Sequence, residues 1–260
     1  MRLTVDGKEV FASTGGHDFN AALPAIIFLH GAGMDHSVWA LLSRSFAYRG
    51  LAVLAPDLPG HGRSAGPPLS SIAAMADWTA ALMDAARIRA ARLVGHSMGS
   101  LVALEAATRH AGKVTGLGLI ATAAAIRVSA ELLGAAKAND HAAIDMVSLW
   151  GYGYHATIGG CEAPGLWMLG GAERLLEQAR SGVLYTDLSA CNDYQDALAA
   201  AAKVNVPAVM ILGSRDLMTP AKSGRALAAA IPACRLTVLE GAGHMLMSER
   251  SDAVLAALRA

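Results

Sequence analysis

The sequence predicts an α/β fold, in which helices cover both faces of a mostly parallel sheet. Short apolar segments alternate along the chain with longer amphipathic segments, as expected when each strand is followed by a helix that crosses back over the sheet. The apolar segments are almost continuously hydrophobic, which strands buried on both faces require. A chain of 260 residues can bury enough surface to form one sizeable core.

Six apolar segments are predicted to be parallel strands: 25–30, 51–56, 91–96, 114–122, 206–213 and 235–240. Pro56 ends the second segment, because proline lacks the N–H that a central strand needs. Two glycines weaken the fourth segment. Two shorter segments, near residues 4 and 11, predict an antiparallel hairpin at one edge of the sheet.

Five amphipathic segments are predicted to be helices: 37–50, 71–88, 98–112, 220–232 and 248–260. In the first of these, Trp39, Leu42 and Phe46 fall on one face, and Gly50 supplies a stop signal. The predicted strands and helices therefore alternate through most of the chain.

The segment 123–200 departs from this alternation. It consists of helical pieces interrupted by glycine-rich loops, and it contains six of the thirteen aromatic residues. No internal repeat or low-complexity linker marks it as an independent domain. We therefore predict a helical cap over 123–200, inserted into a core formed by 1–122 and 201–260.

Composition and charge argue against several classes of protein. The 21 basic and 21 acidic side chains give a formal net charge of zero, and aromatic residues make up 5%, so no nucleic-acid partner is expected. No apolar stretch is long enough for a membrane span, and the first residues lack the hydrophobic region of a signal peptide. Cys161, Cys191 and Cys234 form no metal-binding or disulfide pattern, which predicts reduced thiols in a cytoplasmic protein.

Catalytic chemistry is indicated first by the pentapeptide Gly95-His96-Ser97-Met98-Gly99, which matches G-x-S-x-G. It lies between a predicted strand and a predicted helix, the context in which this motif forms a sharp turn that exposes a nucleophilic serine. The flanking glycines leave room for the turn, and the helix N-terminus favours a developing negative charge. We therefore predict Ser97 as the nucleophile.

A serine hydroxyl needs a base to remove its proton, and the base needs an acid to orient it. His244 lies between the last predicted strand and the final helix, and Asp216 directly follows the preceding strand. The chain order Ser97, Asp216, His244 is the order expected when the nucleophile lies on such a turn. We predict these three residues as a catalytic triad.

An oxyanion hole is predicted from two backbone N–H groups. The sequence His30-Gly31-Ala32-Gly33 follows the first central strand, and its small residues allow the backbone to face a substrate oxygen. The N–H groups of Ala32 and of Met98, which follows the nucleophile, are the predicted donors. His30 is predicted to tie the loop in place rather than to carry protons.

Five segments together resemble the α/β-hydrolase family, across nearly the whole chain: HGAGMDHSVW (30–39), DLPGHGRS (57–64), GHSMGS (95–100), GSRDLMTP (213–220) and GAGHMLMSE (241–249). The resemblance implies a mostly parallel eight-stranded sheet with a cap inserted after the sixth strand. It also implies that Asp57 and Arg63 brace a loop. Ser100 departs from the family pattern, because many relatives have a second glycine there.

An apolar, adaptable substrate pocket is predicted from the methionines that adjoin each predicted catalytic residue and from the aromatic residues of the cap. The candidate substrate-binding residues are Met34, Trp150, Tyr154, Trp167, Met218 and Met245. The predicted chemistry needs no metal ion and no organic cofactor. The predicted partner is a small ester-like molecule, and the sequence indicates no oligomeric state.

The predicted function is the hydrolysis of carboxylic esters of small to medium apolar substrates through an acyl-enzyme. A lactonase, a thioesterase or a carbon–carbon bond hydrolase would use the same triad, so these alternatives stay open. The segment 30–39 also resembles the loop of small hydrolases that act as signalling receptors, which leaves a slow-turnover ligand receptor open as well. GHSMG resembles the esterase and cofactor-free haloperoxidase branch. Ser97 argues against dehalogenases and epoxide hydrolases, whose nucleophile is an aspartate.

Overall fold

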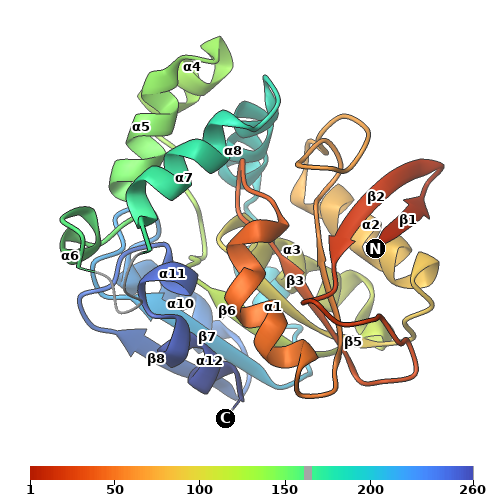
Figure 1. Cartoon of the computed structure of the whole chain (residues 1–260). Helices are drawn as coiled ribbons and strands as arrows, with labels where there is room; N and C mark the ends of the chain where they lie inside the picture. Colours follow the sequence, from red (N-terminus) through yellow and green to blue (C-terminus); the bar gives the residue numbers. More distant parts are fainter. Residues whose placement is uncertain (161–165, 260) are drawn as a thin grey trace.

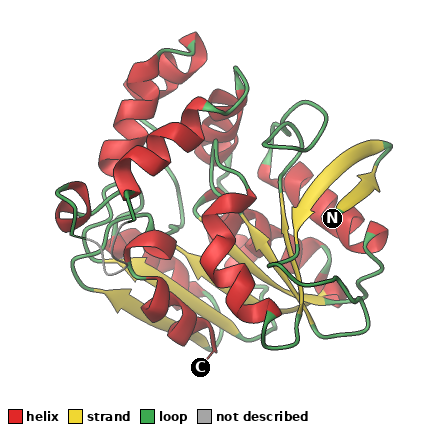
Figure 2. Ribbon diagram, in the orientation of Figure 1, coloured by secondary structure: helices red, strands yellow, loops and turns green. Residues whose placement is uncertain are grey.

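An eight-stranded sheet runs through the centre of the protein, with helices on both faces (Figures 1 and 2). The structure is a computed structural model that describes residues 1–160 and 166–259. The fold class predicted from the sequence is confirmed, and the six predicted parallel strands agree with β3–β8 to within two residues at each end. The strands are β1 (Arg2–Val5), β2 (Lys8–Ser13), β3 (Ala25–Leu29), β4 (Ala52–Pro56), β5 (Ala91–His96), β6 (Val114–Ile120), β7 (Ala208–Gly213) and β8 (Cys234–Leu239).

The strand order is β1-β2-β4-β3-β5-β6-β7-β8. Strands β3 to β8 are parallel to one another, whereas β1 and β2 form the predicted antiparallel hairpin at one edge. Strand β5 lies between β3 and β6, so the C-terminal ends of these three strands lie side by side. The loops that follow them meet at the edge of the sheet where open α/β folds bind their ligands.

Alternate residues of the central strands pack on opposite faces of the sheet. In β3, Ile27 and Leu29 belong to the core under α2 (Ile72–Ala85), α3 (Met98–Arg109) and α10 (Ala221–Ala230). Ile26 and Phe28 instead pack with α1 (Ala40–Ala47) and α12 (Ser251–Arg259), which cover the other face. All four side chains are completely buried. The nearly continuous apolar pattern of the strands is explained by this double burial.

The predicted helices are present, with two of them divided. The segment predicted at 37–50 forms a short 3-10 helix (His36–Trp39) followed by α1, and the segment predicted at 248–260 contains the end of α11 (Leu246–Glu249) and α12. A further 3-10 turn (Ala111–Lys113) follows α3. Ser71 caps α2 by accepting a hydrogen bond from the N–H of Ala74 at 3.2 Å, as expected of a serine at a helix start.

Among the described residues, five of the six helices between β6 and β7 cover the C-terminal edge of the sheet (Figure 1). We call them the cap, and they have a hydrophobic cluster of their own, which includes Leu132, Val147, Leu176 and Leu188. Helix α9 (Ala197–Ala201) falls largely in the range 123–200 but packs on α3 and α10. The cap helices are α4 (Ala130–Ala138), α5 (His141–Trp150), α6 (Tyr154–Thr157), α7 (Met168–Glu177) and α8 (Val183–Asp193).

Two further sequence predictions concern the membrane and the cysteines. Within residues 1–160 and 166–259, no helix has both the length and the apolar character needed to cross a membrane. Cys191 is buried, Cys234 is half-buried, and both are free thiols. Cys161 lies outside the described residues.

Candidate active site

Ser97 lies on the sharp turn between β5 and α3. Its backbone angles, φ 52° and ψ −114°, are rarely adopted by residues with a side chain. A side-chain carbon at Gly95 would overlap the carbonyl group of Gly99, and one at Gly99 would overlap the carbonyl group of Leu29. Glycine is therefore required on both sides of the serine. The turn places Ser97 at the N-terminus of α3, where the helix dipole favours negative charge.

His244 and Asp216 form an oriented pair on the loops that follow β8 and β7. The Nδ1 of His244 donates to Oδ2 of Asp216 at 2.8 Å, and both residues are buried. Two N–H groups, of Met218 and Thr219, donate to Oδ1 of Asp216, and the Thr219 hydroxyl donates to Oδ2. Burial acts to raise the pKa of Asp216, but His244 and these hydrogen bonds outweigh it, so the pKa is lowered. The Nε2 of His244 is left to accept a proton.

Ser97 and His244 both line a cavity of about 230 Å³. Within the described residues, the side-chain hydrogen bonds of His244 go to Asp216 and Thr219 rather than to Ser97; catalytic contacts are often long until substrate is bound. The N–H groups of Ala32 and Met98 have no acceptor in the described part of the chain. They can therefore donate to a substrate oxygen, as oxyanion donors must.

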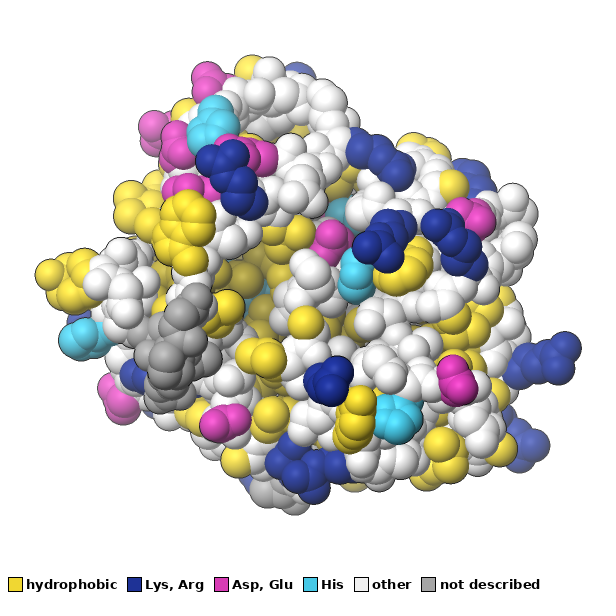
Figure 3. Space-filling model, in the orientation of Figure 1, with side chains coloured by type: hydrophobic (Ala, Val, Ile, Leu, Met, Phe, Trp, Pro, Cys, Tyr) yellow, Lys and Arg dark blue, Asp and Glu magenta, His cyan; other side chains and the backbone are white. Residues whose placement is uncertain are grey.

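The wall of this cavity is mainly apolar and comes from both the core and the cap. Four of the predicted substrate-binding residues line it: Met34, Trp150, Met218 and Met245. Figure 3 shows hydrophobic side chains in the recess between the cap and the core. Arg127 and Ser148 add polar groups to the wall. The Ser148 hydroxyl is buried and has no hydrogen-bond partner in the described structure.

Known proteins share this arrangement over nearly the whole chain. A model of the alpha/beta hydrolase family matches residues 26–257. The pimeloyl-[acyl-carrier protein] methyl ester esterase of Chromobacterium violaceum is 33% identical over 246 residues, which are 90% of this chain and 92% of that protein. The chain belongs to the alpha/beta hydrolase family.

Two further comparisons place the hydrolase among its relatives. The pimeloyl-[acyl-carrier protein] methyl ester esterase of Neisseria meningitidis is 31% identical over 251 residues, which are 92% of each chain. Among solved structures, the enol-lactonase from Burkholderia xenovorans LB400 matches with a TM-score of 0.86 at 26% identity, over 100% of this chain and 98% of the other. The family predicted from the sequence is confirmed.

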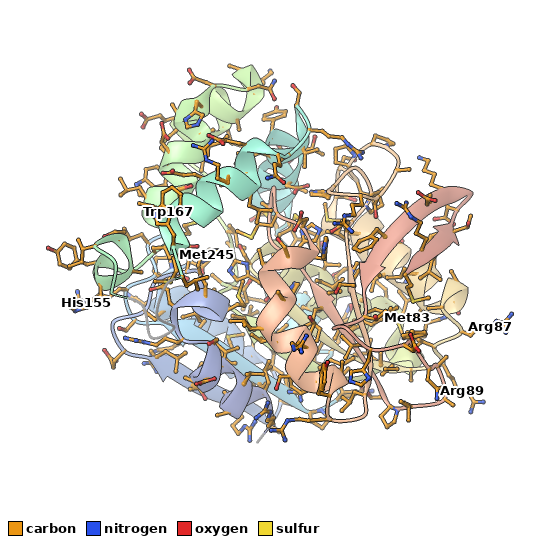
Figure 4. All side chains as sticks on the ribbon, in the orientation of Figure 1. Met83, Arg87, Arg89, His155, Trp167 and Met245 are labelled. Atoms are coloured by element: carbon orange, nitrogen blue, oxygen red, sulfur yellow. The ribbon has the colours of Figure 1, made fainter. Side chains whose placement is uncertain are left out.

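The hydrolase does not bring Tyr154 and Trp167 to the cavity, although both were predicted to bind substrate. These residues are 73% and 70% exposed. Trp167 lines a neighbouring surface groove together with Met245, and Figure 4 shows the two residues at the boundary between cap and core. The ring of Trp167 lies against Gly170, where a side-chain carbon would overlap it. The clustering of aromatic residues in the sequence does not show whether each ring points into the cavity or towards solvent.

Ser100 has a structural role that the sequence left unassigned. Its hydroxyl donates to the carbonyl oxygen of Gly95 at 2.7 Å and accepts from the N–H of Ile120 at 2.9 Å. It therefore ties α3 to the ends of β5 and β6. A second glycine at this position would lose both hydrogen bonds beneath the nucleophile.

Two histidines of the hydrolase flank the site without facing the cavity. The Nδ1 of His30 donates to the carbonyl of Gly31, and its Nε2 accepts from the N–H of Leu58, so His30 ties the loop as predicted. His96 donates from Nε2 to the carbonyl oxygen of His244 at 3.0 Å. Burial, followed by the charges of neighbouring histidines, lowers the pKa of His30 to about 4 and that of His96 to about 3. Both rings are therefore neutral at pH 7.

The loop after β4 is braced as the family resemblance implies. Asp57 accepts hydrogen bonds from the N–H groups of His36 and Arg63 at 2.8 Å each and from Nδ1 of His36 at 2.7 Å. Two other buried residues, His61 and Asp187, reach the same region and were not predicted. Because they lie 126 positions apart, no spacing in the sequence signals their contact.

Proposed function

We propose that the protein is a serine hydrolase that cleaves carboxylic esters through an acyl-enzyme. One observation carries the proposal: Ser97, on its strained turn, opens into the same apolar cavity as His244, which Asp216 orients. Relatives at 33% and 31% identity are named as methyl ester esterases, which supports the same reaction type.

In the proposed first step, Nε2 of His244 takes the proton of the Ser97 hydroxyl as Oγ attacks the ester carbonyl. The carbonyl oxygen becomes an oxyanion, which the N–H groups of Ala32 and Met98 stabilise. His244 then gives its proton to the departing alcohol, and the acyl-enzyme remains on Ser97.

The acyl-enzyme is broken down in the reverse manner. His244 removes a proton from a water molecule, the resulting hydroxide attacks the acyl carbon, and the proton returns to Ser97 as the carboxylic acid leaves. Asp216 holds the Nδ1–H of His244 through both steps, so that Nε2 always faces the reacting atoms.

The proposed substrate is a small to medium ester with a mostly apolar body. A cavity of about 230 Å³ is small for a ligand pocket, and nine of the residues that line it are methionine or leucine. The exposed acidic side chains of the cap, among them Glu131, Asp140 and Asp145, give its outer surface a negative character (Figure 3). A strongly anionic substrate would therefore be repelled on approach.

Lactone hydrolysis is the second candidate. The enol-lactonase of Burkholderia xenovorans LB400 matches this chain over its whole length with a TM-score of 0.86. A lactone is a cyclic ester, so the same steps would open it, with the alcohol remaining attached to the acyl group. Rates on a γ-lactone and on its open-chain methyl ester would separate the two activities.

The decisive experiment combines a covalent probe with turnover. A fluorophosphonate should add its mass at Ser97, and Ser97→Ala should lower kcat on p-nitrophenyl butyrate by roughly a thousandfold or more. Ser181→Ala, at an exposed turn serine, is the matched control and should retain the parent rate. Parent-like turnover by Ser97→Ala would contradict the proposal. A single burst with negligible steady-state turnover would favour the ligand receptor instead.

We also propose a cytoplasmic location. The free thiols of Cys191 and Cys234 suit a reducing compartment. Immunodetection of the protein in fractionated cells tests this, and recovery outside the cytoplasmic fraction would contradict it.

A further inference from the structure

Asp187, in cap helix α8, contacts the loop that carries a predicted oxyanion donor. Its carboxylate is completely buried, and Oδ2 accepts a hydrogen bond from the N–H of Gly33 at 2.9 Å. Gly33 directly follows Ala32 and has a φ of 69°. A side-chain carbon at Gly33 would lie 2.9 Å from Cδ1 of Leu184, also in α8. The loop is therefore held closely against the cap.

His61 provides the opposite charge for Asp187. The Nε2 of His61 lies 2.8 Å from Oδ2 of Asp187, and its Nδ1 lies 3.0 Å from the carbonyl oxygen of Pro59. Because both ring nitrogens face oxygen acceptors, each carries a hydrogen and the imidazole is positively charged. Burial acts to lower the pKa of His61, but the charge of Asp187, its hydrogen bond to the ring and the Pro59 carbonyl oxygen together outweigh burial and raise the pKa.

This ion pair is separate from the pair formed by His244 and Asp216. It lies wholly inside the protein, and its two members come from the cap and from the loop after β4. Neither Asp187 nor His61 lines the cavity that contains Ser97. A buried ion pair adds little stability compared with apolar packing, because both charges lose their hydration. A role in fixing one particular geometry accounts for it better.

We propose that Asp187 is a positioning residue for the oxyanion hole, and that it sets the orientation of the Ala32 N–H by holding the N–H of Gly33. The inference rests on the proposed ester hydrolysis. Only the φ and ψ angles of Ala32 separate the two peptide planes concerned. Because steric clashes allow these angles few combinations, fixing the plane that follows Ala32 leaves the preceding plane few orientations. The His61 imidazolium, 2.8 Å from Oδ2, helps to hold the carboxylate in place. The cap thus contributes to stabilising the transition state as well as to enclosing the substrate.

The geometry also explains why Asp187 acts on the transition state more than on the bound ester. An oxyanion donor stabilises charge that develops only as the serine attacks. A displaced Ala32 N–H would therefore lower kcat more than it raises KM. A loss of folded protein would instead reduce every activity and every binding capacity together.

The test compares Asp187→Ala, Asp187→Asn and His61→Asn with the parent enzyme and with Asp193→Asn. Asp193 is an exposed carboxylate on the same helix, so its variant is the matched control. Four quantities are measured for each: kcat and KM on p-nitrophenyl butyrate, the inhibition constant of butylboronic acid, and the inhibition constant of butanol. The boronic acid bonds to the serine oxygen and places a negative oxygen at the oxyanion position, whereas butanol reports binding in the cavity alone.

We expect Asp187→Ala to lower kcat by about 10- to 100-fold and to lower the affinity for butylboronic acid by the same factor. KM and butanol inhibition should change less than about threefold. Asp187→Asn keeps an oxygen acceptor for Gly33 and should recover most of kcat. His61→Asn removes the counter-ion and should fall between the parent and Asp187→Ala, and Asp193→Asn should match the parent.

Two results would overturn the inference: unchanged kcat and boronic acid affinity in Asp187→Ala, or a loss of butanol affinity as large as the loss of kcat. If Asp187→Ala does not fold, the inference is tested with His61→Asn instead. A boronic acid affinity of His61→Asn equal to that of the parent would then overturn the inference. The proposed function is tested separately, by whether the parent turns over the ester and Ser97→Ala does not. The inference depends only on the kinetic constants of the Asp187 and His61 variants relative to those of the parent.

Discussion

Acidification should destabilise this protein strongly, because two histidines beside the candidate site are buried in their neutral form. His30 and His96 are both completely buried. Burial is the main cause that lowers their pKa values to about 4 and about 3, and the neighbouring His61 and His244 lower them further. In the unfolded chain each would take up a proton near pH 6.5.

The direction and size of the effect follow from proton binding. Below about pH 6.5 the unfolded state binds more protons than the folded state, so stability falls as pH falls, down to about pH 4 for His30 and about pH 3 for His96. Between about pH 7 and about pH 5, each histidine should cost about 2 kcal/mol, or about 4 kcal/mol together. His61 acts oppositely, because its raised pKa stabilises the folded state at low pH, and it offsets part of this loss.

Urea unfolding followed by tryptophan fluorescence measures the effect at a series of pH values. The parent is compared with His96→Asn, which keeps a side-chain N–H donor but removes one titrating group. Over the same pH interval, the variant should lose about 2 kcal/mol less than the parent, with an unchanged urea dependence. Equal losses in the two proteins would refute the assignment of His96 as a buried neutral imidazole.

Four further substitutions, one of them a comparison on α4, test the packing of the protein. Ser100→Ala should lower the free energy of unfolding by about 1–3 kcal/mol, because it leaves the N–H of Ile120 without its acceptor; an unchanged urea midpoint would contradict this. Ser148→Ala removes a buried hydroxyl without a partner among the described residues, so calorimetry should show a neutral or stabilising effect of up to about 1 kcal/mol. A clear loss of stability would instead indicate that the hydroxyl makes a hydrogen bond in the folded protein. Gly99→Ala should lower stability by about 3 kcal/mol or more or abolish soluble expression, whereas Gly134→Ala, in open space on α4, should stabilise by about 0.5–1 kcal/mol; equal behaviour of the two would contradict the steric argument.

The fold and the candidate triad could be predicted because their signals are local. The apolar strand before Gly95, the glycine at 99 and the helix that follows all lie within one short stretch, and the backbone angles of Ser97 agree with them. Asp216 and His244 each follow a strand directly, so their positions depend only on the order of strands in the sheet. The positions of these three residues therefore do not depend on how the cap packs.

The parts that escaped prediction depend on long-range packing. Trp167 lies at the start of α7, and the rotation of that helix about its axis decides whether the ring faces the cavity or solvent. The glycine-rich sequence around it does not indicate this rotation. The contact of Asp187 with His61 and Gly33 needs the cap to dock on two loops at once. Ser100 appeared only as a departure from a pattern, although its hydroxyl joins three elements.

The insertion point of the cap has a consequence for how such enzymes diversify. The cap leaves the sheet after β6 and returns at β7, and these strands are direct neighbours, with Ile120 paired to Ile211. Because the two strands are parallel, the chain leaves the C-terminal end of β6 at Ile120 and re-enters β7 at Ala208, which pairs with Leu117. The two ends are therefore one strand and three residues apart, roughly 11 Å, and lengthening a loop between fixed ends costs only logarithmically. Exchange of the whole segment can thus change substrate range without moving the strands that carry the candidate triad. A transplanted cap would still need a carboxylate where Asp187 stands, which limits the exchange to segments that meet the Gly33 loop in the same way.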